Sequence, residues 1–453
     1  MRFIVRELKI AVVGGGMFFE EIIGQALKDF ERGGFAGGLT SIGMSHFAPQ
    51  VADIQCRFVA IGTHSPKTRS AERIVEWFTQ EFGDSKVKAY YGEEVWVNIL
   101  DECQPDILFV ATPDHLHVAP IMAAIERGVH VITEKPVCLK TSEIDNIIAL
   151  AEKHNVIVAA DMHKRYDPFV RDMMTHAREK YDKINRVRAC LEEPIDVSTE
   201  IFKWAENSNP FTYVGCHWLD VVDHYLGVIP ASLHAIGQKN LLSNWGEYYK
   251  IVAQKEGRPV NEFSKHEDIM TWDALSVGVT YTDGMYGEYH NNWINPRDFD
   301  GAVNQEIELY GALGRGIVDQ QERGFRETLT GGGTRTRNPA FSGRIKNRGG
   351  YVEAFGYGKA SIVAGVLAVA RIKFFDEISQ TLGGSYPDVR SQRNITMIVE
   401  AAAEVAQRNY DSLNTGKGCP VTARFDENRI IIIDPNQANL KTILYENKTN
   451  NNT

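Results

Sequence analysis

A carboxylate and an ammonium group stand side by side at Glu134-Lys135-Pro136. They follow an apolar stretch, 128–133, that we expect to be a strand, and they precede a helix expected to open at Thr141. Ligands of open parallel sheets bind beyond the carboxyl ends of the strands, so a lysine at this position predicts a ligand site. The alternative is a surface ion pair followed by a turn-forming proline.

Upstream, a run of three glycines at 14–16 follows another apolar stretch, 8–13, and the chain then becomes polar and helical in pattern over 20–30. Strand, glycine turn and helix together form a phosphate-binding arrangement, because glycines let the backbone approach a pyrophosphate and the helix N-terminus offers free N–H groups. In the G-x-G-x-x-G pattern the third glycine falls at position 19, where this chain has Phe19. We therefore expect helix and strand to pack differently here.

The next expected strand, 57–62, ends in a loop, 63–69, that is rich in hydroxyl and basic side chains. An enzyme that prefers NAD usually has an acid here to accept hydrogen bonds from the ribose 2′-hydroxyl, whereas basic side chains accommodate a 2′-phosphate. No acid occurs before Glu72. The loop favours NADP over NAD, through the candidate cofactor residues Thr63, Ser65, Lys67 and Arg69.

Strands alternate with helical stretches through the first third of the chain, which is typical of a doubly wound parallel sheet, the Rossmann arrangement. We expect this α/β domain to span residues 1–160, with strands at 8–13, 57–62, 106–111, 128–133 and from Val156.

The remainder, 161–453, is expected to form an α+β domain with a large, open, mostly antiparallel sheet. Helices at 360–375 and 394–407 would cover one face of that sheet, and the other face would meet another subunit. The expected strands are 184–193, 232–238, 273–282, 285–293 and 304–310, with a hairpin turn at 282–284.

The order of these motifs resembles the glucose–fructose oxidoreductase, inositol dehydrogenase and MocA (Gfo/Idh/MocA) family. Its members are nicotinamide-dependent sugar and cyclitol oxidoreductases with a Rossmann domain and a second α/β domain, whose open antiparallel sheet carries oligomer contacts. The resemblance covers the chain in outline and is specific across about 106–227. It rests on the glycine turn, on T-P-x-x-x-H (Thr112, Pro113, His117), on E-K-P and on G-x-H-x-x-D (Gly215, His217, Asp220).

The resemblance implies a role for each matching residue. Gly14 and Gly16 would lie under the pyrophosphate, Glu134 would touch the nicotinamide ribose, Lys135 would hydrogen-bond the reacting hydroxyl, and His217 would be the catalytic histidine. Lys135 also counts among the expected cofactor contacts. The remaining candidates are Met17, Thr112, Pro113 and His117 for the cofactor, and Tyr213 and Arg165, beside Lys135 and His217, for the substrate. Tyr213 also counts among the candidate catalytic residues, with Lys135 and His217.

The family's usual aspartate four residues before the histidine is replaced here by Tyr213. Residues four apart share a helix face, so Tyr213 and His217 should face the same way. A neutral phenol can orient an imidazole or contact substrate, but it cannot stabilise an imidazolium by charge, so we expect His217 to be less basic than in members with aspartate. The pattern D-x-x-x-H also occurs at Asp220 and His224, but the spacing to Gly227, which should close the helix, favours His217.

Composition excludes other classes of function. A chain of 453 residues with 43% hydrophobic residues can form about two to three domains. The net charge of −10 argues against a nucleic-acid partner. Six cysteines without a C-x-x-C pair indicate neither a metal site nor disulfides, and no apolar run approaches the roughly 20 residues of a membrane span. The chain enters a strand almost at once, without a signal peptide, so we expect a cytoplasmic protein. The oligomer contacts of the family's open sheet imply a homodimer or homotetramer.

Two glycine-rich regions exceed a minimal family member. Segment 30–49 is either a flap near the cofactor or an insertion. Segment 331–350 carries five cations, which would bind an acidic sugar or a phosphate, remain solvated, or lie in a subunit contact; they are Arg335, Arg337, Arg344, Lys346 and Arg348.

Taken together, the residues predict an NAD(P)-dependent oxidoreductase that acts on a carbohydrate or cyclic polyol. His217 would move the hydroxyl proton, and Lys135 would hold the oxygen. One alternative is a redox-neutral glycosidase that uses NAD transiently. Another is a sensor without turnover, since Phe19 and Tyr213 break the usual patterns, although Lys135 and His217 disfavour it.

Overall fold

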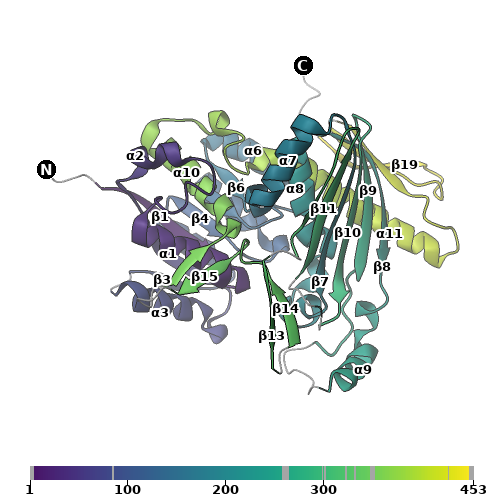
Figure 1. Ribbon diagram of the computed structural model, residues 1–453, viewed down its shortest axis with the longest axis horizontal. Helices are drawn as coiled ribbons and strands as arrows, with labels where there is room; N and C mark the ends of the chain where they lie inside the picture. The colour runs from purple at the N-terminus through teal and green to yellow at the C-terminus, as the bar shows by residue number, and fades with distance from the viewer. Residues whose placement is uncertain are drawn as a thin grey trace. The chain divides into compact units, whose positions relative to one another are not determined.

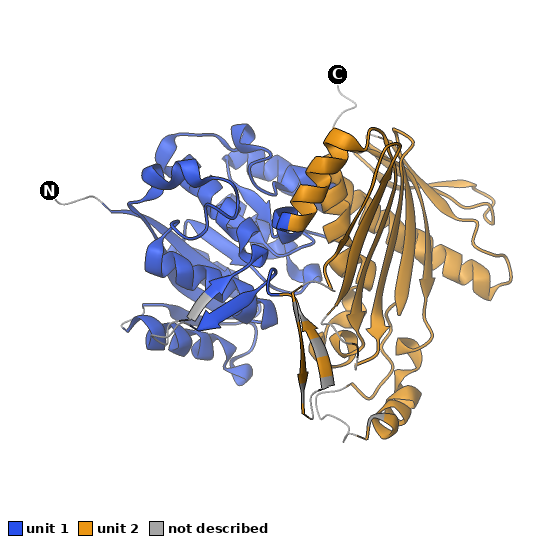
Figure 2. Ribbon diagram, viewed as in Figure 1, with its two compact units in different colours: residues 1–138, 143–168, 339–393 blue, residues 139–142, 169–338, 394–453 orange. Residues whose placement is uncertain are grey.

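The computed structural model describes residues 5–83, 86–257, 265–297, 299, 303–321, 324–330, 333–346, 352–426 and 428–447. The chain divides into two compact units (Figure 2): unit 1 contains residues 1–138, 143–168 and 339–393, and unit 2 contains 139–142, 169–338 and 394–453. The domain boundary at residue 160 stays a prediction, and the return of 339–393 to the first unit was not anticipated. No helix in the described ranges is long and apolar enough to cross a membrane.

Unit 1 contains a six-stranded parallel sheet in the order β3-β2-β1-β4-β5-β6 (Figure 1). This is the Rossmann order, so the predicted doubly wound sheet is confirmed. The prediction missed β3 because its four residues, K-A-Y-Y, form no apolar run. The strands are β1 Arg6–Val13, β2 Ile54–Thr63, β3 Lys88–Tyr91, β4 Ile107–Val110, β5 His130–Thr133 and β6 Val158–Ala160.

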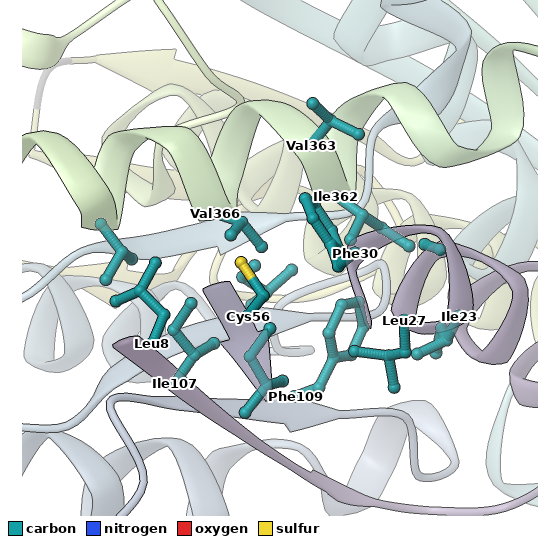
Figure 3. Close-up of a cluster of buried hydrophobic side chains, with 14 of the residues drawn as sticks. Leu8, Ile23, Leu27, Phe30, Cys56, Ile107, Phe109, Ile362, Val363 and Val366 are labelled. Atoms are coloured by element: carbon teal, nitrogen blue, oxygen red, sulfur yellow. The ribbon is translucent and has the colours of Figure 1, made fainter. Parts of the chain in front are cut away.

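Helices cover both faces of this sheet. One face packs against α1, α3 and α10, and Figure 3 shows Leu8, Ile107 and Phe109 meeting side chains of α1 and α10 there. On the other face, a Cβ on Gly62 would lie 2.9 Å from Val95 Cγ2 of α4, so the helix sits directly on β2. The helices are α1 Gly24–Gly33, α2 Ala48–Val51, α3 Ser70–Phe82, α4 Val95–Cys103, α5 Val118–Glu126, α6 Thr141–His154 and α10 Ala360–Phe375.

Helix α10 has the predicted bounds, but the expectation that it covers the antiparallel sheet is wrong. It packs in unit 1, where a Cβ on Gly365 would lie 3.0 Å from Ile132 of β5 and 3.3 Å from Ala159 of β6. Its sequence is apolar on all sides, so it fits any large apolar surface. Local pattern therefore could not select its partner.

The glycine-rich segment 30–49 is a packed part of unit 1. Phe35, Leu39 and Ile42 are buried in the same core as α10. A Cβ on Gly38 would lie 2.7 Å from Val363, so only glycine permits this approach to α10. These contacts fit the interpretation of segment 30–49 as an insertion better than its interpretation as a flap near the cofactor.

Unit 2 contains a nine-stranded sheet in the order β12-β11-β7-β10-β9-β8-β17-β18-β19. Every pair of adjacent strands in this sheet is antiparallel except the pair β7 and β10, so the predicted mostly antiparallel sheet is confirmed. The strands are β7 Ile184–Pro194, β8 Pro230–Gln238, β9 Ala274–Tyr281, β10 Tyr286–Asn295, β11 Asn304–Gly311, β12 Arg315–Asp319, β17 Thr422–Asp426, β18 Arg429–Ile433 and β19 Lys441–Glu446.

The turn between β9 and β10 has the expected glycine in left-handed backbone, Gly284 with φ 88°. The helices of unit 2 are α7 Pro168–Lys180, α8 Cys216–Leu226, α9 Trp245–Glu256 and α11 Arg393–Asn414.

Two hairpins follow the nine-stranded sheet's β12, namely β13 Phe325–Leu329 with β14 Gly333–Arg337, and β15 Gly343–Lys346 with β16 Val352–Phe355. Of the five cations predicted there, Arg344 donates to the carbonyl of Glu20 in unit 1 (Nη2 to O, 3.4 Å). Residues 331, 332 and 347–350, with Arg348, lie outside the described residues.

Candidate functional site

The glycine turn after β1 is built for close approaches. Gly14 has φ 104°, and a Cβ on it would lie 2.2 Å from the carbonyl oxygen of Ala111 at the end of β4. A Cβ on Gly16, by contrast, would meet no protein atom within 4 Å. The backbone at Gly16 is therefore open to a ligand, as a pyrophosphate cradle requires.

The helix after this turn begins unusually, which explains the missing third glycine. Residues Phe19–Ile23 form a π-helical turn, and Phe19 is buried with its ring 6.1 Å from that of Phe58 in β2. Close packing is left to Gly15, where a Cβ would lie 2.9 Å from Ile74 of α3. A large side chain at position 19 thus fills the core without closing the turn.

Three polar side chains at the carboxyl-end edge of the sheet have buried oxygen atoms without a hydrogen-bond partner among the described residues. They are Thr63 Oγ1, Thr112 Oγ1 and Glu134 Oε1, which lie at the ends of β2, β4 and β5. Buried polar atoms in native proteins nearly always have a hydrogen-bond partner, and a polar ligand at this edge would supply partners for these three oxygen atoms. With the open backbone at Gly16, these residues fit a dinucleotide.

Glu134 and Lys135 follow β5 directly and are both buried, with 8% and 5% of their surface exposed. The Lys135–Pro136 peptide bond is cis. Burial and the neighbouring Asp161 carboxylate raise the pKa of Glu134 well above its usual range, while Lys135 opposes this effect. Two charged side-chain types buried together at a sheet edge indicate a site rather than a solvated ion pair.

His117 connects the loops after β4 and β5. Its Nδ1 lies 2.7 Å from the carbonyl oxygen of Pro136, and its Nε2 lies 2.8 Å from that of Thr112. Burial lowers the pKa of His117, which favours the neutral ring. These contacts link Thr112, in the loop after β4, to Pro136, the residue after Lys135, whereas the predicted cofactor contact of His117 remains a prediction.

The loop after β2 presents basic side chains to solvent. Ser65 Oγ accepts a hydrogen bond from the backbone N–H of Lys67 at 3.3 Å. Arg69 has left-handed backbone, φ 50°, and its exposed guanidinium lies 3.6 Å from Glu76. Met17 and the loop's cations are accessible. The cofactor contact of Met17 and the contacts of the cations with a 2′-phosphate remain predictions.

In unit 2, His217 lies in the first turn of α8 and is buried, with 4% of its surface exposed. Gly215 brings this helix onto the sheet, because a Cβ there would lie 2.7 Å from Asn291 Oδ1 of β10. Trp218 Nε1 donates to the carbonyl of Cys190 in β7 at 2.8 Å. Gly227 ends the helix in left-handed backbone, φ 64°, as predicted.

Tyr213 lies in a π-helical turn, Phe211–Gly215 (η8), immediately before α8. Its ring contacts an aromatic cluster, at centroid distances of 4.7 Å to Phe202, 5.6 Å to Trp204 and 6.2 Å to Trp293. These contacts were not predicted, because the partners lie on other segments. Tyr213 therefore has a packing role whatever it does for His217.

Arg165 lies in a 3₁₀ turn, His163–Tyr166, after β6 and is 4% exposed. Its Nη2 donates to Ser391 Oγ at 2.9 Å, so this part of the guanidinium is held within unit 1. Its predicted contact with substrate remains a prediction. Prediction also missed Asp161, a buried acid directly after β6, although an acid that follows an apolar strand is a readable signal.

Comparison with known proteins agrees with this geometry. Residues 8–162 match the family model GFO_IDH_MocA, described as an oxidoreductase family with an NAD-binding Rossmann fold. The chain is 27% identical over 226 residues to D-glucoside 3-dehydrogenase of Escherichia coli (strain K12), a match that covers 48% of this chain and 58% of the relative. It is 31% identical over 257 residues to levoglucosan dehydrogenase of Pseudarthrobacter phenanthrenivorans, covering 52% and 65%.

Solved structures share the fold over most of the chain. Myo-inositol 2-dehydrogenase from Lactobacillus plantarum has a TM-score of 0.57 at 16% identity, covering 93% of this chain and 100% of that one. GenD2 from gentamicin A biosynthesis, solved in complex with NAD, has a TM-score of 0.61 at 16% identity, covering 89% and 95%. The N-terminal segment 8–162 therefore matches the Gfo/Idh/MocA oxidoreductase family, as its motifs predicted, while the chain spans about half to two thirds of the length of the two relatives named above.

Proposed function

We propose that this chain is an NAD(P)-dependent dehydrogenase acting on a CH–OH group of a sugar or cyclic polyol. The observation that carries the proposal is the buried Glu134-Lys135 pair at the carboxyl end of β5, in the same sheet whose β1 leads to the open backbone of Gly16. When bound, a nicotinamide supplies the hydride acceptor or donor.

The residues of the chain would supply orientation and proton transfer. Gly14 and Gly16 would lie under the pyrophosphate, and Glu134 would face the nicotinamide ribose. Lys135 would hold the reacting oxygen and stabilise the negative charge that develops on it. His217 would take the hydroxyl proton during oxidation and return it during reduction.

The names of two relatives narrow the substrate. One is D-glucoside 3-dehydrogenase; the other, from Acidithiobacillus ferrooxidans, is UDP-N-acetylglucosamine 3-dehydrogenase, 34% identical over 65 residues that cover 14% of this chain and 21% of the relative. Both names specify the third carbon of a glucose-configured ring. We therefore propose the C3 hydroxyl of a glucoside as the reacting group.

A matched pair of substrates tests this proposal. A methyl glucoside and its 3-deoxy analogue differ only in the reacting hydroxyl, and each is offered with NAD and with NADP while absorbance of the reduced nicotinamide is followed. We expect reduced coenzyme from the glucoside alone. Equal rates with both sugars would exclude C3, and reduction by neither, across a panel of sugars and cyclitols, would exclude the dehydrogenase.

A redox-neutral reaction is the second candidate, because relatives of 28% identity over 141 and 183 residues are named 2,7-anhydro-N-acetylneuraminate hydratases. Such an enzyme, or a glycosidase that uses NAD transiently, would convert its substrate without accumulating reduced coenzyme. A chromogenic glucoside distinguishes the cases, since release of the aglycone at constant nicotinamide absorbance indicates the redox-neutral reaction. A sensor would bind coenzyme and give neither signal.

The same proposal includes a preference for NADP, which the exposed cations near Arg69 support. It also includes a cytoplasmic location and a homodimer or homotetramer. Light scattering coupled to gel filtration would determine the oligomeric state, and a monomeric mass would contradict the proposal.

A further inference from the structure

Two buried carboxyl groups occupy equivalent positions at the ends of neighbouring strands. Thr133 of β5 pairs with Ala160 of β6, and the next residues along the two strands are Glu134 and Asp161. The backbone N–H of Asp161 donates to the carbonyl of Thr133 at 2.8 Å, which continues the ladder to this point. Asp161 is fully buried and Glu134 is 8% exposed.

The side chains of Glu134 and Asp161 lie within hydrogen-bonding reach of each other, so they can share a proton. Within the described residues, neither Glu134 Oε1 nor Asp161 Oδ2 has a hydrogen-bond donor. Two buried carboxylates in contact cannot both ionise at low cost, whereas one proton between them satisfies both oxygens. Burial and the charge of Asp161 accordingly raise the pKa of Glu134, against the opposing charge of Lys135.

The surroundings decide which carboxyl holds the proton. Ser361, in the first turn of α10, donates its hydroxyl to Asp161 Oδ1. A hydroxyl donor and the positive N-terminal end of a 16-residue helix thus both lie at Asp161, where they complement negative charge. His163 Nδ1 lies 3.8 Å from the same oxygen, but burial lowers the pKa of His163 and keeps its ring neutral.

We propose that Asp161 and Ser361 are positioning residues that hold Glu134 as a neutral carboxylic acid, able to donate a hydrogen bond to the nicotinamide ribose. The pair then carries a single negative charge, located at Asp161 and stabilised by α10. Lys135 therefore has a neutral acid, and not a carboxylate, as its neighbour at position 134. This inference rests on the proposed function only where it assigns Glu134 to the coenzyme.

Infrared spectroscopy of the protein without coenzyme tests the shared proton directly. We expect a carbonyl stretch from a protonated, buried carboxyl group that persists at neutral pH. Asp161→Asn removes the like charge, so Glu134 should ionise and the band should disappear; Glu134→Gln should remove it as well. A native spectrum without the band, or a band unchanged in both variants, overturns the proposal.

The pH dependence of NAD binding, measured by calorimetry, tests both positioning residues. Ionisation of Glu134 should end tight binding, at a pH that falls by about one unit or more in Asp161→Asn, which removes the like charge, and that also falls in Ser361→Ala, where Asp161 competes better for the shared proton. Ser385→Ala is the control, because Ser385 also lies in segment 339–393 but donates to the carbonyl of Leu382. A rise of this pH in either variant, or an unchanged pH dependence in both, would overturn the proposal.

The two measurements separate this inference from the proposed function. If the infrared band behaves as expected but no nicotinamide coenzyme binds, the carboxyl pair is established and the dehydrogenase is excluded. If NAD binds and sugars are oxidised without the band, the dehydrogenase stands and the carboxyl pair is overturned. Circular dichroism of each variant confirms that the fold is retained.

Discussion

Tyr213 and His217 lie about one helical turn apart across the junction between the π-helical turn η8 and helix α8. A π turn is wider than an α turn, so four residues come closer to a full turn than in a regular helix. We therefore expect the two side chains to leave the helix on the same side. Tyr213 also packs against Phe202, Trp204 and Trp293, which makes its substitution a test of two roles at once.

We expect Tyr213→Phe to keep the melting temperature, because the ring contacts remain. Tyr213→Asp places a carboxylate in the aromatic cluster and should lower the free energy of unfolding by roughly 3 kcal/mol. If the side chains at positions 213 and 217 are in contact, the aspartate variant should also raise the pKa of His217 that is seen in the pH profile of kcat/KM. A superimposable profile, with activity abolished by His217→Ala, would show that Tyr213 only packs.

Gly14 and Gly16 should respond differently to alanine. Gly14→Ala meets the Ala111 carbonyl in strained backbone and should cost roughly 3 kcal/mol or more of stability. Gly16→Ala meets no protein atom, so it should change stability by less than about 0.5 kcal/mol but weaken NAD binding. Gly33→Ala, also in open space, is the control. Unaltered NAD affinity in Gly16→Ala would place the pyrophosphate elsewhere.

Lys135→Ala should lower kcat by a factor on the order of hundreds, as expected for the loss of one preorganised charge at the reacting oxygen. Coenzyme affinity, measured by titration of intrinsic fluorescence, should change little. Lys140→Ala serves as the control, because Lys140 is exposed and lies 3.5 Å from Glu400. A collapse of coenzyme affinity with kcat unchanged would make Lys135 a binding residue instead.

Coenzyme choice is tested at the loop after β2. Arg69→Ala and Lys67→Ala should weaken NADP more than NAD, because each removes a cation available to a 2′-phosphate. Arg73→Ala, on the exposed side of α3, should affect neither coenzyme. Calorimetric titration of the native protein decides the preference, and tighter binding of NAD would refute it.

The elements that sequence predicted well are those whose own pattern determines them. The apolar strands β1, β2, β4 and β5 and the turn at Gly14 follow from local hydrophobicity and backbone geometry. The apolar stretch directly before Glu134 was sufficient to predict that Lys135 follows the carboxyl end of a strand.

Long-range contacts explain what could not be predicted. The uniformly apolar α10 gave no sign of which sheet it covers, and Ser361 acquires its partner Asp161 only through that packing. The aromatic partners of Tyr213 come from segments separated from it in sequence, so its packing role could not be read from helical spacing. Contacts of this kind depend on the tertiary fold and not on any local pattern.

His130 should make stability depend on pH. Burial, more than the charge of Lys373, lowers its pKa to about 4 against the pull of Asp106, and its Nδ1 accepts the N–H of Ile157 at 2.9 Å. The unfolded chain therefore binds a proton that the folded chain does not. This contribution is complete above the ordinary pKa of 6.5 and is lost as the pH falls towards 4.

The loss amounts to about 3 kcal/mol at most. His130→Asn keeps an acceptor for Ile157 without titrating, so its free energy of unfolding should fall less between neutral pH and about pH 4.5. Urea denaturation of both proteins at the two pH values measures the difference. Parallel losses would show that His130 titrates normally in the folded protein.

The return of residues 339–393 to unit 1 has a consequence for how the protein is made. The Rossmann sheet is encoded within the first 160 residues, yet one of its faces is covered by α10, which ends at Phe375. During synthesis, the part of that face that α10 covers remains apolar and exposed until most of the chain has left the ribosome. A fragment that stops at Pro168 should therefore aggregate, whereas the same fragment supplied with a peptide spanning α10 should regain solubility.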